Sequence, residues 1–317
     1  MQMDGIHFAG RSVPVFLLFI KQHIQYFDML NVYDFMKELP PGKRLVVNDL
    51  LFAEYKCPLS ETRYDMWTHH NYFVYVIKGR KKWFAGDHGI LAREGDCIFI
   101  RKGAHSIYQY FDDEFCSLFM FVPDAFIRDT ILENQINVPA RQNAADPQPI
   151  LRVETDELMT SYFFSLLSFI SHSGSSNKKL AELKFRELIL TVCSASGNTE
   201  LLNYFQKLCR TSRPSLASAM ESNFTYPMEL SEYARLSGRS LSAFRRDFKE
   251  IFGTTPGKWL VSKRLEHGRF LLEHSDKPVS EVILDCGFKN FSHFSRAFKE
   301  KYDITPAQVK KTSKQKN

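Results

Sequence analysis

Side chains able to bind a negatively charged partner recur at helical spacing in two places towards the end of the sequence. An arginine can pair bidentately with the edge of a guanine, whereas lysine and serine mostly reach phosphates. Both places therefore favour contact with nucleic acid, although a single solvated helix face would show a similar pattern. The first place carries Ser242, Arg245, Arg246 and Lys249. The second carries Asn290, Phe291, Ser292, His293, Arg296 and Lys299.

The two places lie in copies of one repeated module. Residues 231–256 read SEYARLSGRSLSAFRRDFKEIFGTTP, and residues 280–306 read SEVILDCGFKNFSHFSRAFKEKYDITP. Each copy predicts a short helix that ends at a glycine, followed by a second helix that ends at Thr-Pro. Phe244, Phe248 and Phe252 recur every four residues and predict a buried side for the second helix of the first copy. A helix, a glycine turn and a helix with a basic front form the helix-turn-helix arrangement, whose second helix enters the major groove of DNA.

A long helix is predicted between the two copies. Residues 256–275 read PGKWLVSKRLEHGRFLLEHS, in which Pro256 is well placed at the first helical position and the apolar face is wide. A helix of roughly 18 residues is about 27 Å long. Successive major grooves on one face of DNA are roughly 34 Å apart. The duplication therefore predicts that one chain binds two adjacent half-sites.

Positive charge is concentrated in the segment that holds the repeat. The 317 residues carry a formal net charge of +6, and residues 215–317 alone hold 18 Lys and Arg against 12 Asp and Glu. Such a segment is expected to bind a polyanion.

The cysteines include no C-x-x-C pair, which favours reduced thiols in a cytoplasm without a metal or another cofactor. The apolar run at 13–20 is shorter than the about 20 residues that span a bilayer, so no membrane contact is predicted; the natural start is expected at Met1 or near Met29.

Short strands dominate the first half of the sequence. Residues 44–122 hold aromatic and β-branched segments such as YFVYVIKG and CSLFMFVP, separated by glycine or aspartate turns, which predicts an antiparallel barrel or sandwich. Helices are predicted after Pro123, and the polar stretch around Pro214 is the candidate domain boundary. The expected fold class is α+β. Its parts are an N-terminal extension at 1–43, a barrel at 44–123, helices at 124–210 and an all-helical domain at 215–317.

Residues 216–309 resemble the DNA-binding domain of AraC/XylS-type transcriptional regulators. The resemblance rests on the two repeat copies and on the PxxWLxxxRLxxGRxLL pattern of the long helix. It implies promoter DNA and RNA polymerase as partners, a role as an activator, and contacts to bases or backbone by the two basic faces. At packing positions the chain departs from the usual residues of the family at Gly268, Ile283, Asp303 and Val309.

The N-terminal part resembles the cupin-like sensor domain of the same family. The segments HHNYFVYVIKG and DHGILAREGDCIFIRKGAHSIY carry this resemblance. It implies an effector pocket, and a filled aromatic core is the alternative for the same residues. Metal-binding cupins add a carboxylate to such histidines, and none stands in the expected window after His70, so no metal is predicted. The candidate pocket residues are Trp67, His69, His70, Tyr72, Tyr75, Trp83 and His105.

Further alternatives concern partners and function. Control by a small molecule in the barrel competes with control by a protein that docks on the N-terminal domain, because the resembled family includes activators of secretion systems that are controlled in this way. A metal-dependent cupin enzyme joined to a DNA-binding tether is the competing function, and a regulator rather than an enzyme is expected. A helical stripe is the candidate seam of a homodimer, with packing on the chain's own barrel as the alternative. The stripe consists of Ala181, Phe185, Leu188 and Val192.

Overall fold

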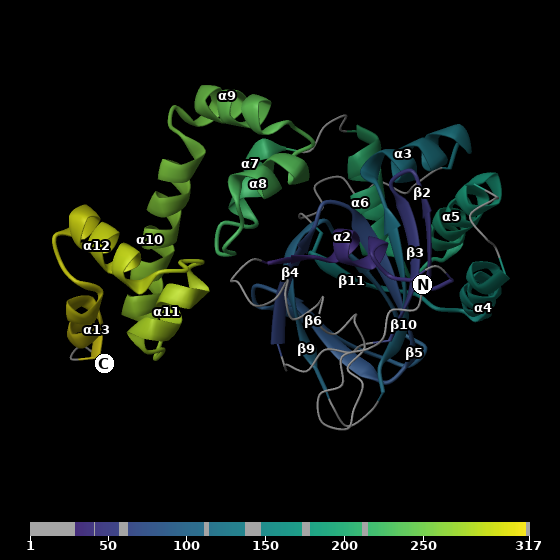
Figure 1. The fold of residues 1–317 in the computed structure, drawn as a ribbon, viewed down its shortest axis with the longest axis horizontal. Helices are drawn as coiled ribbons and strands as arrows, with labels where there is room; N and C mark the ends of the chain where they lie inside the picture. The colour runs from purple at the N-terminus through teal and green to yellow at the C-terminus, as the bar shows by residue number, and fades with distance from the viewer. Residues whose placement is uncertain are drawn as a thin grey trace, which may run out of the picture.

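The chain folds into a sheet-rich part followed by a helical part, which lie next to each other in Figure 1. The computed structural model describes residues 29–40, 42–56, 63–110, 114–136, 147–172, 178–210 and 215–314. The apolar run at 13–20, most of the expected extension and the expected linker around Pro214 lie outside the described residues. Within the described ranges, no helix combines the length and the apolar character that crossing a bilayer requires.

Two sheets build the N-terminal part. One has five strands in the order β1-β4-β9-β6-β7, and the other has six in the order β11-β8-β5-β10-β3-β2. Neighbouring strands run antiparallel apart from β1 and β4. β1 falls in the segment expected to be an extension, and β11 falls in a segment expected to hold helices only. The strands are β1 Leu30–Asn31, β2 Arg44–Val47, β3 Leu50–Lys56, β4 Arg63–Thr68, β5 Asn71–Lys78, β6 Arg80–Ala85, β7 His88–Arg93, β8 Cys97–Ile100, β9 Gly103–Gln109, β10 Cys116–Val122 and β11 Ile150–Val153.

The six-stranded sheet separates two apolar cores. In β5, Tyr72 and Val74 point between the two sheets, whereas Phe73 and Tyr75 point to the outer face. Successive side chains of a strand point to opposite faces, and because both faces are covered here the strand is apolar on both. This double burial explains why the segment reads as a continuous apolar run rather than an alternating one.

Helices cover the outer face of the six-stranded sheet, as Figure 1 shows. The rings of Phe185 and Phe52 stack there with their centroids 3.7 Å apart. A polar network closes one end of this layer: the Tyr204 hydroxyl donates to Asn71 at 3.0 Å, and Asn71 donates to Asp124 at 2.6 Å. These helices are α3 Asp124–Glu133, α4 Glu157–His172, α5 Lys178–Ser194 and α6 Thr199–Arg210, and a further helix, α2 Val32–Lys37, packs into the core between the sheets.

The C-terminal part is entirely helical in the described residues, and α10 runs between two smaller groups of helices (Figure 1). Phe244 and Phe248 belong to the core at one end of α10, and Phe294 and Phe298 belong to the core at the other end. The predicted arrangement of two modules on a long connecting helix is confirmed. The helices are α7 Leu216–Glu221, α8 Leu230–Leu236, α9 Leu241–Phe252, α10 Pro256–His274, α11 Val279–Asp285, α12 Phe291–Tyr302 and α13 Pro306–Lys314.

The ends of the two module helices differ from the expectation. α9 and α12 end at Gly253 and Asp303, which both adopt the left-handed conformation with φ of 67° and 58°. The Thr-Pro dipeptides come afterwards, and Pro256 and Pro306 are the first residues of the next helices. The prediction that Thr-Pro ends the helix is therefore wrong, because a left-handed residue ends it and proline suits the first turn of the next.

Candidate nucleic-acid interface

The first helix-turn-helix unit consists of α8 and α9. The Glu232 carboxylate accepts a hydrogen bond from the Glu229 N–H at 2.5 Å, which stabilises the start of α8. Gly238 follows α8 in the left-handed conformation, with a φ of 63° that glycine adopts without steric cost. The Ser240 hydroxyl accepts from the Ala243 N–H at 3.3 Å and caps α9. These local signals explain why the sequence breaks into two helices here.

The outer face of α9 carries the predicted basic residues. Arg246 donates to Asp247 at 3.0 Å, and Asp247 also accepts from Arg239 at 3.1 Å. The hydrogen bond from Arg239 is the main cause that lowers the pKa of the Asp247 carboxyl. The Arg246 side chain is 75% exposed, so its surface ion pair with Asp247 is weak. Replacing this ion pair with a contact to a DNA phosphate or base therefore costs little free energy. Ser242, Arg245, Arg246 and Lys249 are all exposed.

The second unit consists of α11 and α12 and repeats the same geometry. Gly287 turns the chain with a φ of 75°. The side-chain oxygen of Asn290 accepts from the His293 N–H at 2.9 Å and caps α12. Asn290 was expected to contact DNA; its side-chain oxygen caps the helix, and the residue is exposed. The other predicted residues of this face, Phe291, Ser292, His293, Arg296 and Lys299, are exposed.

The connecting helix α10 holds both units. Its 19 residues correspond to a length of about 28 Å. Leu260 packs into the first core and Leu265 into the second. Gly268 lies in close contact with α12, because an added Cβ would be 3.0 Å from the ring of Phe294. Gly268, which departs from the family's usual residue, thus lies at a tight packing contact.

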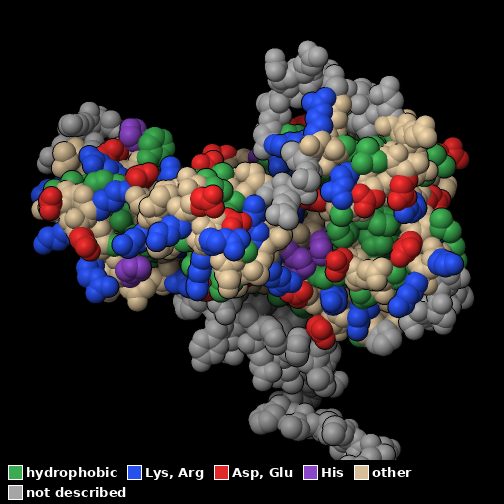
Figure 2. Space-filling view, turned by 90° about the horizontal axis from the view of Figure 1, so that it is seen from above, with side chains coloured by type: hydrophobic (Ala, Val, Ile, Leu, Met, Phe, Trp, Pro, Cys, Tyr) green, Lys and Arg blue, Asp and Glu red, His purple; other side chains and the backbone are tan. Residues whose placement is uncertain are grey.

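Basic side chains spread over the helical part in Figure 2, which views the molecule from above. This distribution agrees with the excess of Lys and Arg over Asp and Glu in residues 215–317. The field of such a surface attracts polyanions and is screened by salt.

Comparisons with known proteins match both parts of the chain. The family model described as ExsA N-terminal regulatory domain covers residues 71–204, and a helix-turn-helix domain model covers residues 233–312. Virulence regulon transcriptional activator VirF of Yersinia enterocolitica is 22% identical, over 75% of this chain and 88% of that protein. HTH-type transcriptional regulator ExsA of Pseudomonas aeruginosa is 21% identical, over 68% and 76%. The chain belongs to the AraC family of transcriptional regulators. A solved structure of ToxT from Vibrio cholerae is 12% identical to this chain with a TM-score of 0.41, covering 82% and 96%.

The residues expected to line one pocket of this AraC-family regulator are divided among different places. Tyr72, Trp83 and His105 lie between the sheets, and the Tyr72 hydroxyl is 2.6 Å from Nε2 of His105. Tyr75 points to the outer face and stacks on Phe163 of α4 with the ring centroids 4.1 Å apart. The assignment of Tyr75 to the same pocket is wrong, because residues three apart in a strand point to opposite faces.

The space between the sheets of this AraC-family chain is filled by its own side chains. The described residues leave a cavity of about 20 Å³ there, which is room for about one water molecule. Burial lowers the pKa of His105 to about 4, so the imidazole is neutral at pH 7. This interior therefore fits a filled aromatic core rather than an effector pocket.

Trp67, His69 and His70 lie at the boundary with the helical part. The guanidinium of Arg235 in α8 lies 5.3 Å from the ring centroid of Trp67, and its nitrogen is 3.3 Å from both ring nitrogens of His69. The rings of His69 and His70 are 4.2 Å apart, and burial lowers the pKa of His69 to about 3. His105 is separate from them, bonded to Tyr72 inside the sheets. Among the residues that the structure describes, no group of three or more His, Cys, Asp or Glu side chains could hold a metal ion.

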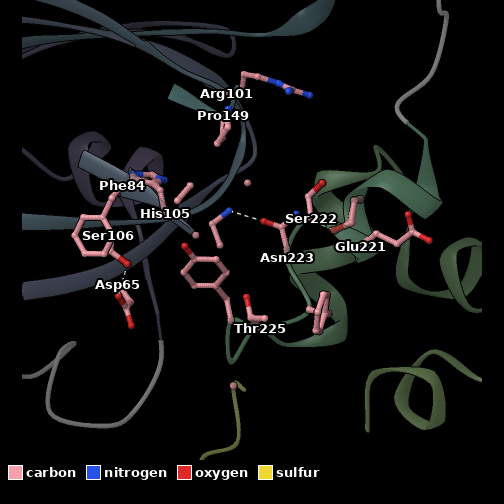
Figure 3. Close-up of a pocket in the computed structure, with 18 of the residues that line it drawn as sticks. Asp65, Phe84, Arg101, His105, Ser106, Pro149, Glu221, Ser222, Asn223 and Thr225 are labelled. Carbon is pink, nitrogen blue, oxygen red and sulfur yellow. Dashed lines mark hydrogen bonds between the residues drawn. The ribbon is translucent and has the colours of Figure 1, made fainter. Parts of the chain in front are cut away.

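A cleft of about 1360 Å³ lies between β9 and the helical part, and Figure 3 shows residues of both sides facing one another. The Ala104 N–H of β9 donates to Oδ1 of Asn223 at 2.7 Å across this boundary. Ser106 of the same strand donates to Asp65 at 2.5 Å. Sequence reasoning missed Asn223, because the segment between α7 and α8 has no periodic pattern that would signal a contact.

The stripe expected to form a dimer seam lies in the outer core of the sheet-rich part. Phe185 is 1% exposed and stacks on Phe52, and the other members of the stripe are completely buried. The assignment of this stripe to a dimer seam is therefore wrong, because its apolar area is already used against the chain's own sheet. The buried members are Ala181, Leu188 and Val192.

Proposed function

We propose that this chain activates transcription by binding promoter DNA with α9 and α12 in two successive major grooves. The observation that carries the proposal is the pair of helix-turn-helix units, each with an exposed basic face, at the two ends of α10. The relatives above are transcriptional regulators, and VirF is named an activator. That relationship favours a regulator over an enzyme, and activation implies contact with RNA polymerase once the chain is bound.

Each exposed residue of the two helices has a role that its chemistry suggests. Arg246 and Arg296 occupy corresponding positions of the two copies, and a guanidinium can read guanine with two parallel hydrogen bonds. Lys249 and Lys299 also correspond, and an ammonium at this position suits a phosphate. Ser242, Arg245, Phe291, Ser292 and His293 would complete the surface, with Asn290 acting through the cap of α12.

Selection of DNA from a random pool by the full-length protein, followed by affinity measurement, tests this function. Arg246→Ala combined with Arg296→Ala should weaken binding to the selected DNA by about a hundredfold, because two base-reading pairs are lost. Lys56→Ala combined with Lys82→Ala removes the same charge from exposed strand positions and should change binding little. Equal binding by wild type and the arginine double variant would contradict the proposal.

We infer that a protein docked on the outside of the sheets controls this chain, rather than a small molecule between them. The interior cavity of about 20 Å³ is far below the about 300–1,000 Å³ of ordinary ligand pockets. The match to a regulatory domain model named after ExsA covers residues 71–204, which include strands β5–β11. Native mass spectrometry of the purified protein should give the mass of the chain or of a homodimer without an adduct. A bound molecule of a few hundred daltons per chain would contradict this inference.

A further inference from the structure

The turn formed by residues 223–226, just before α8, touches both helix-turn-helix units and the helix between them. Nε of Arg264, in the middle of α10, donates to the carbonyl oxygen of Phe224 at 2.6 Å. A second guanidinium nitrogen of Arg264 donates to the carbonyl oxygen of Tyr226, also at 2.6 Å. The planar guanidinium thus fixes two carbonyls of one turn in a fork geometry that an ammonium cannot reproduce.

The first unit is attached to this turn through α8. Tyr233 of α8 is completely buried, and its hydroxyl donates to the carbonyl oxygen of Asn223 at 2.8 Å. Asn223 in turn donates through its side chain to the carbonyl oxygen of Ala219 in α7 at 2.8 Å. Any movement of the turn therefore moves the support of α8.

The second unit reaches the same turn through the glycine between α11 and α12. A Cβ added to Gly287 would lie 2.6 Å from the carbonyl oxygen of Thr225 and 3.2 Å from Nε of Arg264. The backbone of the second unit is thus in close contact with the turn and with the guanidinium that holds it. The ion pair that joins Lys289 of the second unit to Glu229 of the first is weak, since the two groups are 3.6 Å apart and Glu229 is 69% exposed.

We propose that Arg264 is a positioning residue for DNA binding. By holding the turn 223–226, it fixes the rotation of the second helix-turn-helix unit relative to the first. This inference rests on the proposed binding of both units to one DNA. A fixed rotation makes the second unit bind at high effective concentration only when its half-site lies at the matching spacing. Substitution of Arg264 should leave each unit folded and able to bind DNA. It should remove the dependence of DNA affinity on the spacing of the half-sites.

The test measures the affinity of the full-length protein for the DNA it selects and for the same DNA with five base pairs inserted between the half-sites. The insertion turns the second half-site by about half a helical turn, since a turn is about 10–10.5 base pairs. Wild type should prefer the original spacing by about tenfold or more. Arg264→Ala and Arg264→Lys should reduce this preference to about twofold or less, while DNA that carries one half-site binds all forms within about twofold.

Lys263→Ala is the matched control, because it removes a cation from the neighbouring position of α10, where Lys263 pairs only with Glu266 at 4.0 Å among the ion pairs of the described residues. It should keep the wild-type preference. Circular dichroism of each variant checks that it is folded. If Arg264→Ala does not fold, the spacing preference is measured with Arg264→Lys alone. Arg264 variants that fold and keep the wild-type spacing preference would overturn the inference. Failure of wild type to select any DNA would instead overturn the proposed function.

Discussion

The guanidinium of Arg235 on α8 forms an ion pair with the carboxylate of Asp34 on α2, with nitrogen-to-oxygen distances of 3.0 and 3.3 Å. The same guanidinium covers the ring of Trp67, which is 2% exposed. One side chain of the first helix-turn-helix unit therefore joins that unit to two elements of the sheet-rich part. The contact links the proposed DNA-binding unit directly to the N-terminal region.

Arg235→Ala is expected to loosen this boundary without unfolding the chain. The side chains of Arg235 and Asp34 are 44% and 48% exposed, and an exposed pair contributes at most about 1 kcal/mol to the free energy of unfolding. Loss of the cover over Trp67 should make tryptophan fluorescence more sensitive to acrylamide quenching. Lys37→Ala, on the same helix as Asp34, is the control. Identical quenching of wild type and Arg235→Ala would show that the boundary does not depend on this contact.

Phe185→Ala tests the packing of α5 on the sheet. Phe185 is 1% exposed and stacks on Phe52, so its removal should lower the free energy of unfolding by about 3–5 kcal/mol. Leu183 lies on the same helix but is 59% exposed, and Leu183→Ala should change that free energy by no more than about 0.5 kcal/mol. Urea denaturation measures both. A small effect of Phe185→Ala would mean that the stripe is not buried against the chain's own sheet.

Gly253 and Gly287, two left-handed glycines of the helical part, should respond differently to alanine. A Cβ added to Gly253 would have no atom within 4 Å, so Gly253→Ala should cost only the strain of a left-handed alanine, about 1–2 kcal/mol. At Gly287 the added Cβ would also meet the carbonyl oxygen of Thr225 at 2.6 Å, and backbone cannot move aside as a side chain can. Gly287→Ala should therefore be clearly the more destabilising in thermal unfolding. Equal losses would contradict the close approach between this turn and Thr225.

Stability should fall as the pH drops from 6.5 towards 4. Burial lowers the pKa of His105 to about 4 in the folded chain, whereas an unfolded chain takes up this proton near pH 6.5. The unfolded state therefore binds more protons in that interval, and folding loses about 2 kcal/mol at pH 5 from this group. His105→Gln keeps a polar partner for Tyr72 and removes the titration. Urea denaturation at pH 7.5 and 5.0 should show a smaller loss for the variant, and an equal loss would exclude His105 as a cause.

The helical part could be predicted from the sequence because its signals are local. The glycines at 238 and 287 and the aromatic residues at four-residue spacing determine where each helix ends and which side it buries. The residues of the two basic faces could be assigned to the outer face for the same reason, and Asn290 is exposed with them. An N-cap is also a local signal, since Asn is one of the preferred residues directly before a helix.

The arrangement of the sheet-rich part depends on long-range packing, and less of it could be predicted. An amphipathic stripe such as that of Phe185 shows which side of a helix is buried and does not show which partner covers it. The pairing of β11 with β8 joins segments far apart in the sequence. Strand periodicity would have separated Tyr72 from Tyr75, and the turn at 223–226 has no sequence pattern at all.

The central claim is that both helix-turn-helix units of one chain bind the same DNA. Hydroxyl-radical footprinting of the full-length protein on its selected DNA tests this most directly. We predict two protected segments on one face of the DNA, with centres about 10 base pairs apart, and Arg296→Ala should remove one of them while the other remains. A single protected segment that Arg296→Ala leaves unchanged would contradict the claim.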